Sequence, residues 1–123
     1  RQILDIGTGI PTKPNLLEVV EGSKTVGIVA RLLSSVARGS YLVLTTHPAS
    51  DIYGELVAES ARCYNESVVT PVTLRTFTQV SRFFDGLELV EPGIVQCHRW
   101  RPEPGDSVDD YDVAGWGAVG RKA

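Results

Sequence analysis

Apolar residues occur along the chain in two patterns, as short continuous runs and as stripes with helical spacing. Residues 1–6 are mostly apolar and end at Gly7, and residues 41–46 form a second continuous run. Such runs predict strands, and the lack of alternation in the second run predicts burial on both of its faces. Between the two runs, apolar residues recur every three or four positions over residues 26–36, which predicts a helix that ends before Gly39.

The second half of the chain continues the alternation of helix and strand. Residues 50–65 predict a helix whose residues available for packing are Leu56, Val57, Ala61 and Tyr64. Thr76, followed three residues later by Gln79, is a capping-box pattern that predicts the start of another helix. The other predicted elements are strands over residues 87–91, 94–95 and 113–119 and a surface loop over residues 102–112. This order predicts a single domain of the α/β class, with helices on both faces of a largely parallel sheet.

The composition is that of an ordinary globular domain and excludes several classes of function. The 123 residues carry a formal net charge of -3, so no nucleic-acid partner is expected. No apolar run approaches the roughly 20 residues of a membrane helix, so no membrane partner is expected. Two cysteines are too few for a disulfide scaffold, which predicts a reducing, cytoplasmic compartment. Because the chain starts at Arg1 and contains no Met, we expect it to be part of a longer protein.

The strongest chemical signal is Asp5-Ile6-Gly7-Thr8-Gly9, at the end of the first predicted strand. Glycines at a strand end adopt positive φ and let the backbone approach a ligand closely, and open α/β folds bind ligands at the carboxyl edge of the sheet. The Asp5 carboxylate would repel a pyrophosphate and attract a cationic ligand. S-adenosylmethionine carries a sulfonium and an ammonium group, so the pattern favours this cofactor over a dinucleotide.

Two other interpretations of this turn stay open at the level of the residues. The Asp5 side chain bonds the backbone amides of its own loop, or the glycine-rich turn binds nothing at all. Thr12 stands where a dinucleotide fingerprint has its third glycine, so a nicotinamide-dependent oxidoreductase is disfavoured.

The longer string from Gln2 to Thr12 resembles the first motif of class I S-adenosylmethionine-dependent methyltransferases. It is similar in particular to a bacterial S-adenosyl methyltransferase family that was formerly catalogued as a domain of unknown function. Further similarity lies in residues 29–44, 82–93, 99–102 and 117–122, and so reaches over nearly the whole chain. The resemblance implies a Rossmann-like sheet whose last strand is antiparallel to its neighbour.

The same resemblance implies a cofactor, S-adenosylmethionine, and a reaction, methyl transfer to a small-molecule acceptor. Gly7 and Gly9 would let the backbone pass the methionine moiety, and Asp5 would orient the loop or the ammonium group. Thr8 and Thr12 would donate hydroxyl hydrogen bonds. Because the sulfonium is already an activated donor, the reaction depends mainly on alignment of the acceptor, and no catalytic residue is predicted.

One part of the family pattern has no counterpart in this chain. The family has three strands between its first helix and the helix before its fifth strand, and here residues 20–25 pass directly from one to the other. The acidic residue that holds the ribose hydroxyls and the pair that flanks the adenine are therefore missing. Since the family's fourth strand lies between its first and fifth, we expect either a gap of about 10 Å between residues 3–6 and 41–46 or a chain break near Val20.

Other candidate residues carry weaker signals. His47 follows a predicted strand, where it is a general base, a substrate contact or simply the cap of the next turn. His98 stands beside Cys97 without further ligands at a suitable spacing, so no metal site is predicted. Trp100, between two arginines, either lines a pocket or packs over the end of the sheet. The alternative function is a non-catalytic binding or assembly module that retains the fold, and nothing in the sequence indicates an oligomeric state.

Overall fold

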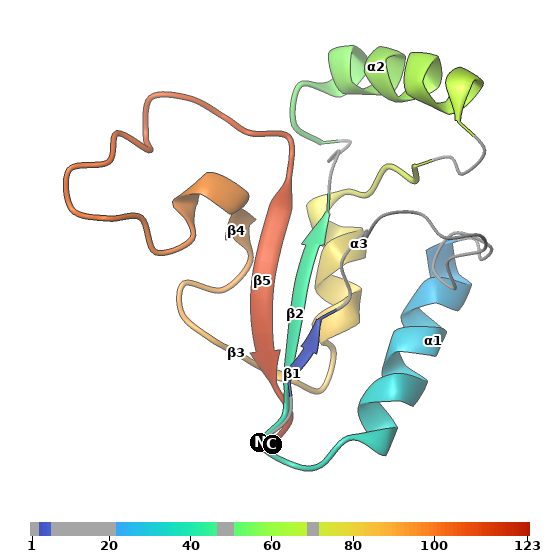
Figure 1. Ribbon diagram of the computed structural model, residues 1–123, viewed down its shortest axis with the longest axis vertical. Helices are drawn as coiled ribbons and strands as arrows, with labels where there is room; N and C mark the ends of the chain where they lie inside the picture. Colours follow the sequence, from blue (N-terminus) through green and yellow to red (C-terminus); the bar gives the residue numbers. More distant parts are fainter. Residues whose placement is uncertain (1–2, 6–21, 47–50, 69–71) are drawn as a thin grey trace.

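The computed structural model describes residues 3–5, 22–46, 51–68 and 72–123, of which residues 3–5 and 22–24 are described by their backbone alone. The elements in chain order are β1 (Ile3–Asp5), α1 (Gly22–Ser35), β2 (Tyr41–Thr46), α2 (Gly54–Ser67), α3 (Phe77–Ser81), the 3-10 turn η1 (Arg82–Phe84), β3 (Glu88–Leu89), β4 (Val95–Gln96), the 3-10 turn η2 (Cys97–Arg99) and β5 (Trp116–Arg121). The α/β class predicted from the sequence is confirmed (Figure 1). Within these described stretches, no helix has the length and apolar character needed to cross a membrane.

The last strand, β5, lies inside the sheet and pairs with three others. The strand order is β1-β2-β5-β3, and β4 also pairs with β5. β5 is antiparallel to β2, β3 and β4, which confirms the antiparallel last strand, although it covers Trp116–Arg121 rather than residues 113–119. Among the described strands only β1 and β2 are parallel, so this sheet is mostly antiparallel instead of largely parallel.

The predicted gap between the first two strands is wrong. β1 pairs directly with β2, with Ile3 opposite Tyr41 and Asp5 opposite Val43. An unpaired strand edge leaves backbone donors and acceptors unsatisfied, at a cost of about 1–3 kcal/mol for each buried group. Direct pairing removes that cost without the family's intervening strand. The other predicted sign, a break near Val20, lies outside the described residues.

The hydrophobic core lies on one face of the sheet. Leu42 and Leu44 of β2 are 0% and 7% exposed and pack with α1, α3, η1 and Ala118 of β5. Figure 1 shows α1 and α3 on this side of the strands. On the opposite face Thr45 is exposed, so burial in β2 alternates, and the prediction that both of its faces are buried is wrong. That face is covered in part by η2, since Cys97 lies beside Gly117 of β5.

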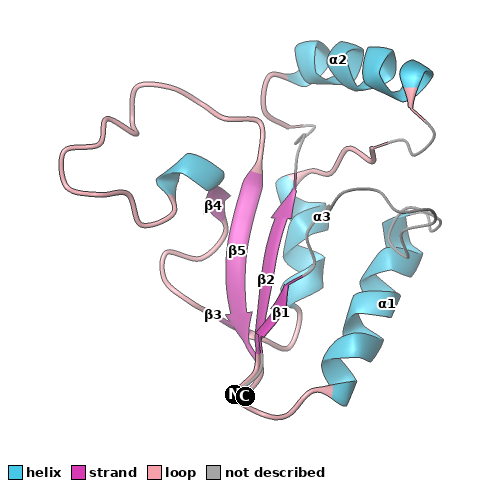
Figure 2. Ribbon diagram, viewed as in Figure 1, coloured by secondary structure: helices cyan, strands magenta, loops and turns pink. Residues whose placement is uncertain are grey.

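The helix α2 lies apart from this core, beyond the carboxyl end of β2 (Figure 2). Only its Val57 and Ala61 are buried, whereas Leu56 is 68% and Tyr64 is 50% exposed. The prediction that Leu56 and Tyr64 pack against the protein is therefore wrong for the described part of the chain. A helix with such a narrow buried stripe contributes little to the core.

Local signals set the ends of α1 and α3. The Thr76 hydroxyl accepts a hydrogen bond from the Gln79 amide at 3.2 Å, and the Gln79 side chain accepts one from the Thr76 amide at 2.9 Å, which confirms the capping box. Gly39, with φ of 83°, turns the chain after α1. The Lys122 ammonium donates to the Leu33 carbonyl at 2.6 Å and also bonds the carbonyls of Ser34 and Val36. A cation on the last carbonyls of a helix stabilises the helix end.

We expect Gly120→Ala to destabilise the protein, because β5 passes too close to the core for a side chain there. A Cβ at Gly120 would lie 2.8 Å from Cδ1 of buried Phe84 and 3.0 Å from Cδ1 of Leu87. Relief of this overlap costs about 1–3 kcal/mol of unfolding free energy, measurable by urea denaturation. Gly117→Ala in the same strand is the control, since its Cβ would meet Cys97 Sγ at an ordinary 3.4 Å. Equal midpoints for the two variants would contradict this account.

Candidate active site

The carboxyl edge of β1 and β2 is where the sequence motif leads. The two strands are parallel and in register, so Asp5 at the end of β1 lies opposite Val43 of β2, and β2 runs on to Thr46. Ligand sites in open α/β folds lie at this edge. Only the backbone of Asp5 is described, and Gly7, Thr8, Gly9 and Thr12 lie outside the described residues, as does His47. The described part of the motif, the backbone of Asp5, lies at this edge.

Asp51, which follows β2, joins three segments at the same edge. One carboxylate oxygen, Oδ2, accepts a hydrogen bond from the Phe77 amide at 2.7 Å, and the other, Oδ1, accepts one from Trp116 Nε1 at 2.8 Å. Trp116 is the first residue of β5 and pairs with Thr46 at the end of β2. Hydrogen bonds to an ionised carboxylate are stronger than neutral ones. Asp51 therefore fixes the start of α3 and the start of β5 relative to β2 (Figure 1).

The two residues that Asp51 bonds also contact each other. The rings of Phe77 and Trp116 meet edge to face, with centroids 5.2 Å apart and planes at 78°. This is a favourable geometry for aromatic rings, because the positive edge of one faces the negative face of the other. Phe77 is 42% exposed, whereas Trp116 packs partly against the core. The pair thus presents an aromatic surface to solvent at the carboxyl edge of the sheet.

Arg75 lies two residues before Phe77, in the segment that enters α3. Its guanidinium is half-buried and sits over the ring of Phe83, 5.6 Å from the ring centroid. Burial lowers the pKa of Arg75 from its usual value. In the part of the chain that the structure describes, no carbonyl or carboxylate accepts a hydrogen bond from this guanidinium. A half-buried group with five N–H donors and no acceptor is unusual in proteins.

The end of the long loop before β5 is held by hydrogen bonds to other segments. Gln96 Nε2 donates to Asp112 Oδ1 at 2.9 Å, and Gln96 Oε1 accepts from the Val113 amide. Arg99 bonds the same Asp112 oxygen at 3.3 Å. The Tyr53 hydroxyl donates to the Asp112 carbonyl at 2.9 Å, from a residue whose φ of 59° is strained. The segment after β2 is therefore bonded to this loop as well as to β5.

The histidine and cysteine candidates do not form a site. His98 stacks on Tyr111 at 4.5 Å, and its Nε2 lies 3.0 Å from the Val108 carbonyl. Because the partner is a carbonyl, Nε2 carries the proton and donates it. Burial raises the pKa of the Cys97 thiol, which keeps it protonated and unreactive. Among the described residues no three His, Cys, Asp or Glu side chains are grouped so as to hold a metal.

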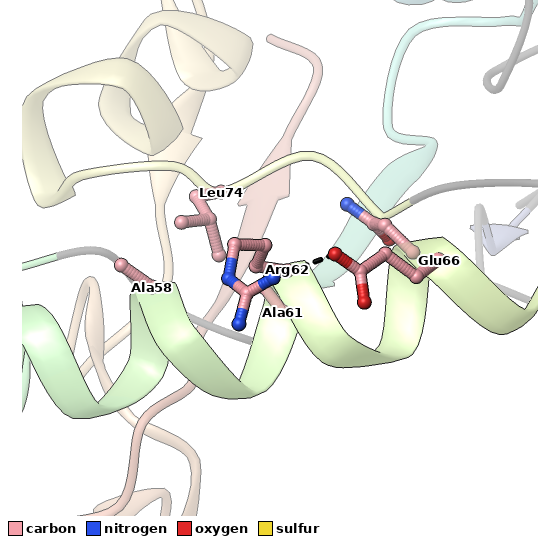
Figure 3. A pocket seen from close by; sticks show the side chains of 6 residues that line it. Ala58, Ala61, Arg62, Glu66 and Leu74 are labelled. Carbon is pink, nitrogen blue, oxygen red and sulfur yellow. Dashed lines mark hydrogen bonds and ion pairs between the residues drawn. The ribbon is translucent and has the colours of Figure 1, made fainter.

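A groove of about 440 Å³ lies elsewhere, between α2 and the segment that follows it (Figure 3). Its lining is apolar at Ala58, Ala61 and Leu74, and an ion pair of 2.6 Å between Arg62 and Glu66 lies at its rim. Asn65 closes one end by bonding the backbone of Val72 in both directions. The groove holds no nucleophile and no titratable pair beyond this exposed ion pair, so it offers no chemistry of its own.

The fold and this edge define a class of protein. The described strands form an α/β sheet whose last strand is antiparallel to its neighbours, as the resemblance to class I S-adenosylmethionine-dependent methyltransferases implies. Residues 19–123 match the sequence profile of the S-adenosyl methyltransferase family, and the chain belongs to this family.

Solved structures agree with this assignment. A DUF574 family protein from Streptomyces avermitilis is 36% identical, with a TM-score of 0.75, and the match covers 98% of this chain and 43% of that protein. A candidate methyltransferase from Thermobifida fusca is 28% identical, with a TM-score of 0.72, over 88% of this chain and 41% of that protein. The chain therefore spans less than half the length of these relatives. No curated protein matches the sequence.

We expect Asp51→Asn to loosen the carboxyl edge without unfolding the core. An amide has one acceptor oxygen, so it satisfies either the Phe77 amide or Trp116 Nε1, and its NH₂ group then faces the other donor. The loss is about 1–3 kcal/mol of unfolding free energy, together with a weaker near-ultraviolet circular dichroism signal from Trp116. Asp109→Asn, on the exposed loop, is the control and changes neither quantity. An unchanged spectrum for Asp51→Asn would show that the carboxylate does not orient the rings.

Proposed function

We propose that this protein transfers a methyl group from S-adenosylmethionine to a small-molecule acceptor. One observation carries the proposal, which is the parallel register of Ile3–Asp5 with Tyr41–Val43. That register supports the proposal because Asp5, the first residue of the motif, ends β1 at the edge of the sheet where α/β folds bind ligands. Membership in the S-adenosyl methyltransferase family supports the choice of cofactor.

The residue types of the motif suit the cofactor's chemistry. S-adenosylmethionine, when bound, supplies a methyl group that is already activated on a sulfonium. Asp5 would hold the ammonium group or the loop, Gly7 and Gly9 would admit the backbone close to the ligand, and the hydroxyls of Thr8 and Thr12 would donate hydrogen bonds. What remains for the protein is to align the acceptor and exclude water. A net charge of -3 supports a small-molecule acceptor over a nucleic acid.

A second candidate function has a specific observation in its favour. The sequence has no counterpart of the family's acidic residue for the ribose or of the pair that flanks the adenine. A binding or assembly module that keeps the fold would show this pattern. Calorimetric titration separates the two, because such a module would release no heat with S-adenosylmethionine.

We expect Gly7→Val to weaken binding of S-adenosylmethionine by more than about tenfold, measured by calorimetry. A branched side chain in the turn would occupy the space of the ligand or forbid a positive φ. Gly27→Val in α1 is the control, since no atom lies within 4 Å of a Cβ at Gly27. The same cell titrated with NAD should give no heat. Equal affinity of the parent and Gly7→Val for S-adenosylmethionine would remove the turn from the cofactor site.

A further inference from the structure

We propose that Arg75, Phe77 and Trp116 form the acceptor site of this protein and that they select an aromatic carboxylate. The proposal rests on the methyl-transfer function proposed above, because it identifies the acceptor of that reaction. Three observations carry it: a half-buried cation for which no described residue is an acceptor, an exposed aromatic surface two residues further along the chain, and the position of both at the carboxyl edge.

The cation is Arg75. Arg99, the other arginine of intermediate burial among the described residues, bonds the Asp112 carboxylate. The Arg75 guanidinium is half-buried over Phe83 without such an acceptor in the described part of the chain. A planar fork of N–H donors matches a carboxylate in two parallel hydrogen bonds. An anionic ligand would thus satisfy donors for which the described residues supply no acceptor.

The aromatic surface lies next to this cation. Thr76, the residue between Arg75 and Phe77, is extended, with φ of -82° and ψ of 166°. Side chains on either side of an extended residue leave the chain on the same side, about 7 Å apart. Phe77 is 42% exposed and is held edge to face against Trp116. A planar ring that packs on Phe77 therefore places a carboxylate substituent within the reach of Arg75.

Asp51 gives the site its rigidity and does not compete for the ligand. Both of its oxygens already accept hydrogen bonds, from the Phe77 amide and from Trp116 Nε1. Among the described residues no acceptor pairs with the Arg75 guanidinium, and a cation of this kind repels a cationic acceptor. The site also adjoins the end of β2, where Trp116 pairs with Thr46, so an acceptor here lies at the same edge of the sheet as the end of β1.

Three small ligands distinguish the contribution of a ligand's carboxylate to binding from that of its aromatic ring. We would titrate the protein with benzoate, cyclohexanecarboxylate and phenol, followed by saturation-transfer-difference NMR. Benzoate has both features and is expected to bind at least about fivefold more tightly than either of the others. Cyclohexanecarboxylate lacks the flat ring, and phenol lacks the charge. Equal binding of benzoate and cyclohexanecarboxylate, equal binding of benzoate and phenol, or no binding of benzoate would each overturn the proposal.

Two variants assign these features to residues. Arg75→Gln should weaken benzoate at least about fivefold and leave phenol unchanged, while Phe77→Leu should weaken benzoate and leave cyclohexanecarboxylate unchanged. Arg38→Gln removes the same charge from an exposed turn at the other end of β2 and should leave all three affinities unchanged. If Arg75→Gln does not give the parent's thermal transition, Arg75→Lys replaces it, and loss of the paired donors should still weaken benzoate. Parent-like benzoate affinity in the folded Arg75 variant would refute the assignment.

Calorimetry with S-adenosylmethionine on the same samples keeps this proposal distinct from the proposed function. Cofactor binding without benzoate binding rejects the acceptor site alone. Benzoate binding with the expected probe order but no cofactor binding rejects methyl transfer, and with it the role of this site as an acceptor site.

Discussion

The antiparallel pairing of β2 with β5 holds the two halves of this protein together. It runs from Tyr41 opposite Arg121 to Thr46 opposite Trp116, so residues near the end of the chain lie between the first strands and the later ones. Each end of the pair carries a polar bond that reaches a helix. At one end Trp116 bonds Asp51, which also accepts from the start of α3, and at the other end Lys122 bonds the last carbonyls of α1. The core beneath the pair is buried only while both strands are in register.

The same pairing positions the candidate site. Trp116 reaches the carboxyl edge because β5 begins where β2 ends, and Phe77 is fixed there through Asp51. Side chains that a paired strand and a capped helix hold are ordered before a ligand arrives, which lowers the entropy cost of binding. Arg75 differs from them, since its guanidinium lies over the ring of Phe83 and no described residue accepts a hydrogen bond from it. The site thus combines an ordered aromatic surface with a half-buried cation.

Local features were predictable from the sequence, and contacts between distant segments were not. The capping box of Thr76 and Gln79 and the turn at Gly39 depend on a few neighbouring residues, so their pattern identifies them. Asp51 accepts hydrogen bonds from Phe77 and Trp116, which are 26 and 65 positions further along the chain. No pattern of spacing in the sequence predicts a hydrogen bond over such a separation. The exposure of Leu56 and Tyr64 was missed because an apolar stripe does not say whether the fold supplies a partner. For the motif turn, the residue types can be read from the sequence. The described part of the fold adds only that β1, which precedes the turn, runs parallel to β2 and ends at Asp5.

Direct pairing of β1 with β2 bears on which groups of the protein can recognise the cofactor. In the family pattern a strand separates the two, whereas here they are neighbours, about 4.8 Å apart, so Asp5 lies beside Val43 of β2. The family's groups for the ribose and the adenine have no counterpart in the sequence. In the proposed function, recognition therefore falls on the amino-acid end of the cofactor, where the Asp5 carboxylate and the ammonium carry opposite charges. Binding through exposed charges is screened by salt within about 10 Å at 0.1 M, unlike binding through a buried adenine. The cofactor affinity of this chain should accordingly depend on ionic strength more steeply than that of a relative with all its strands.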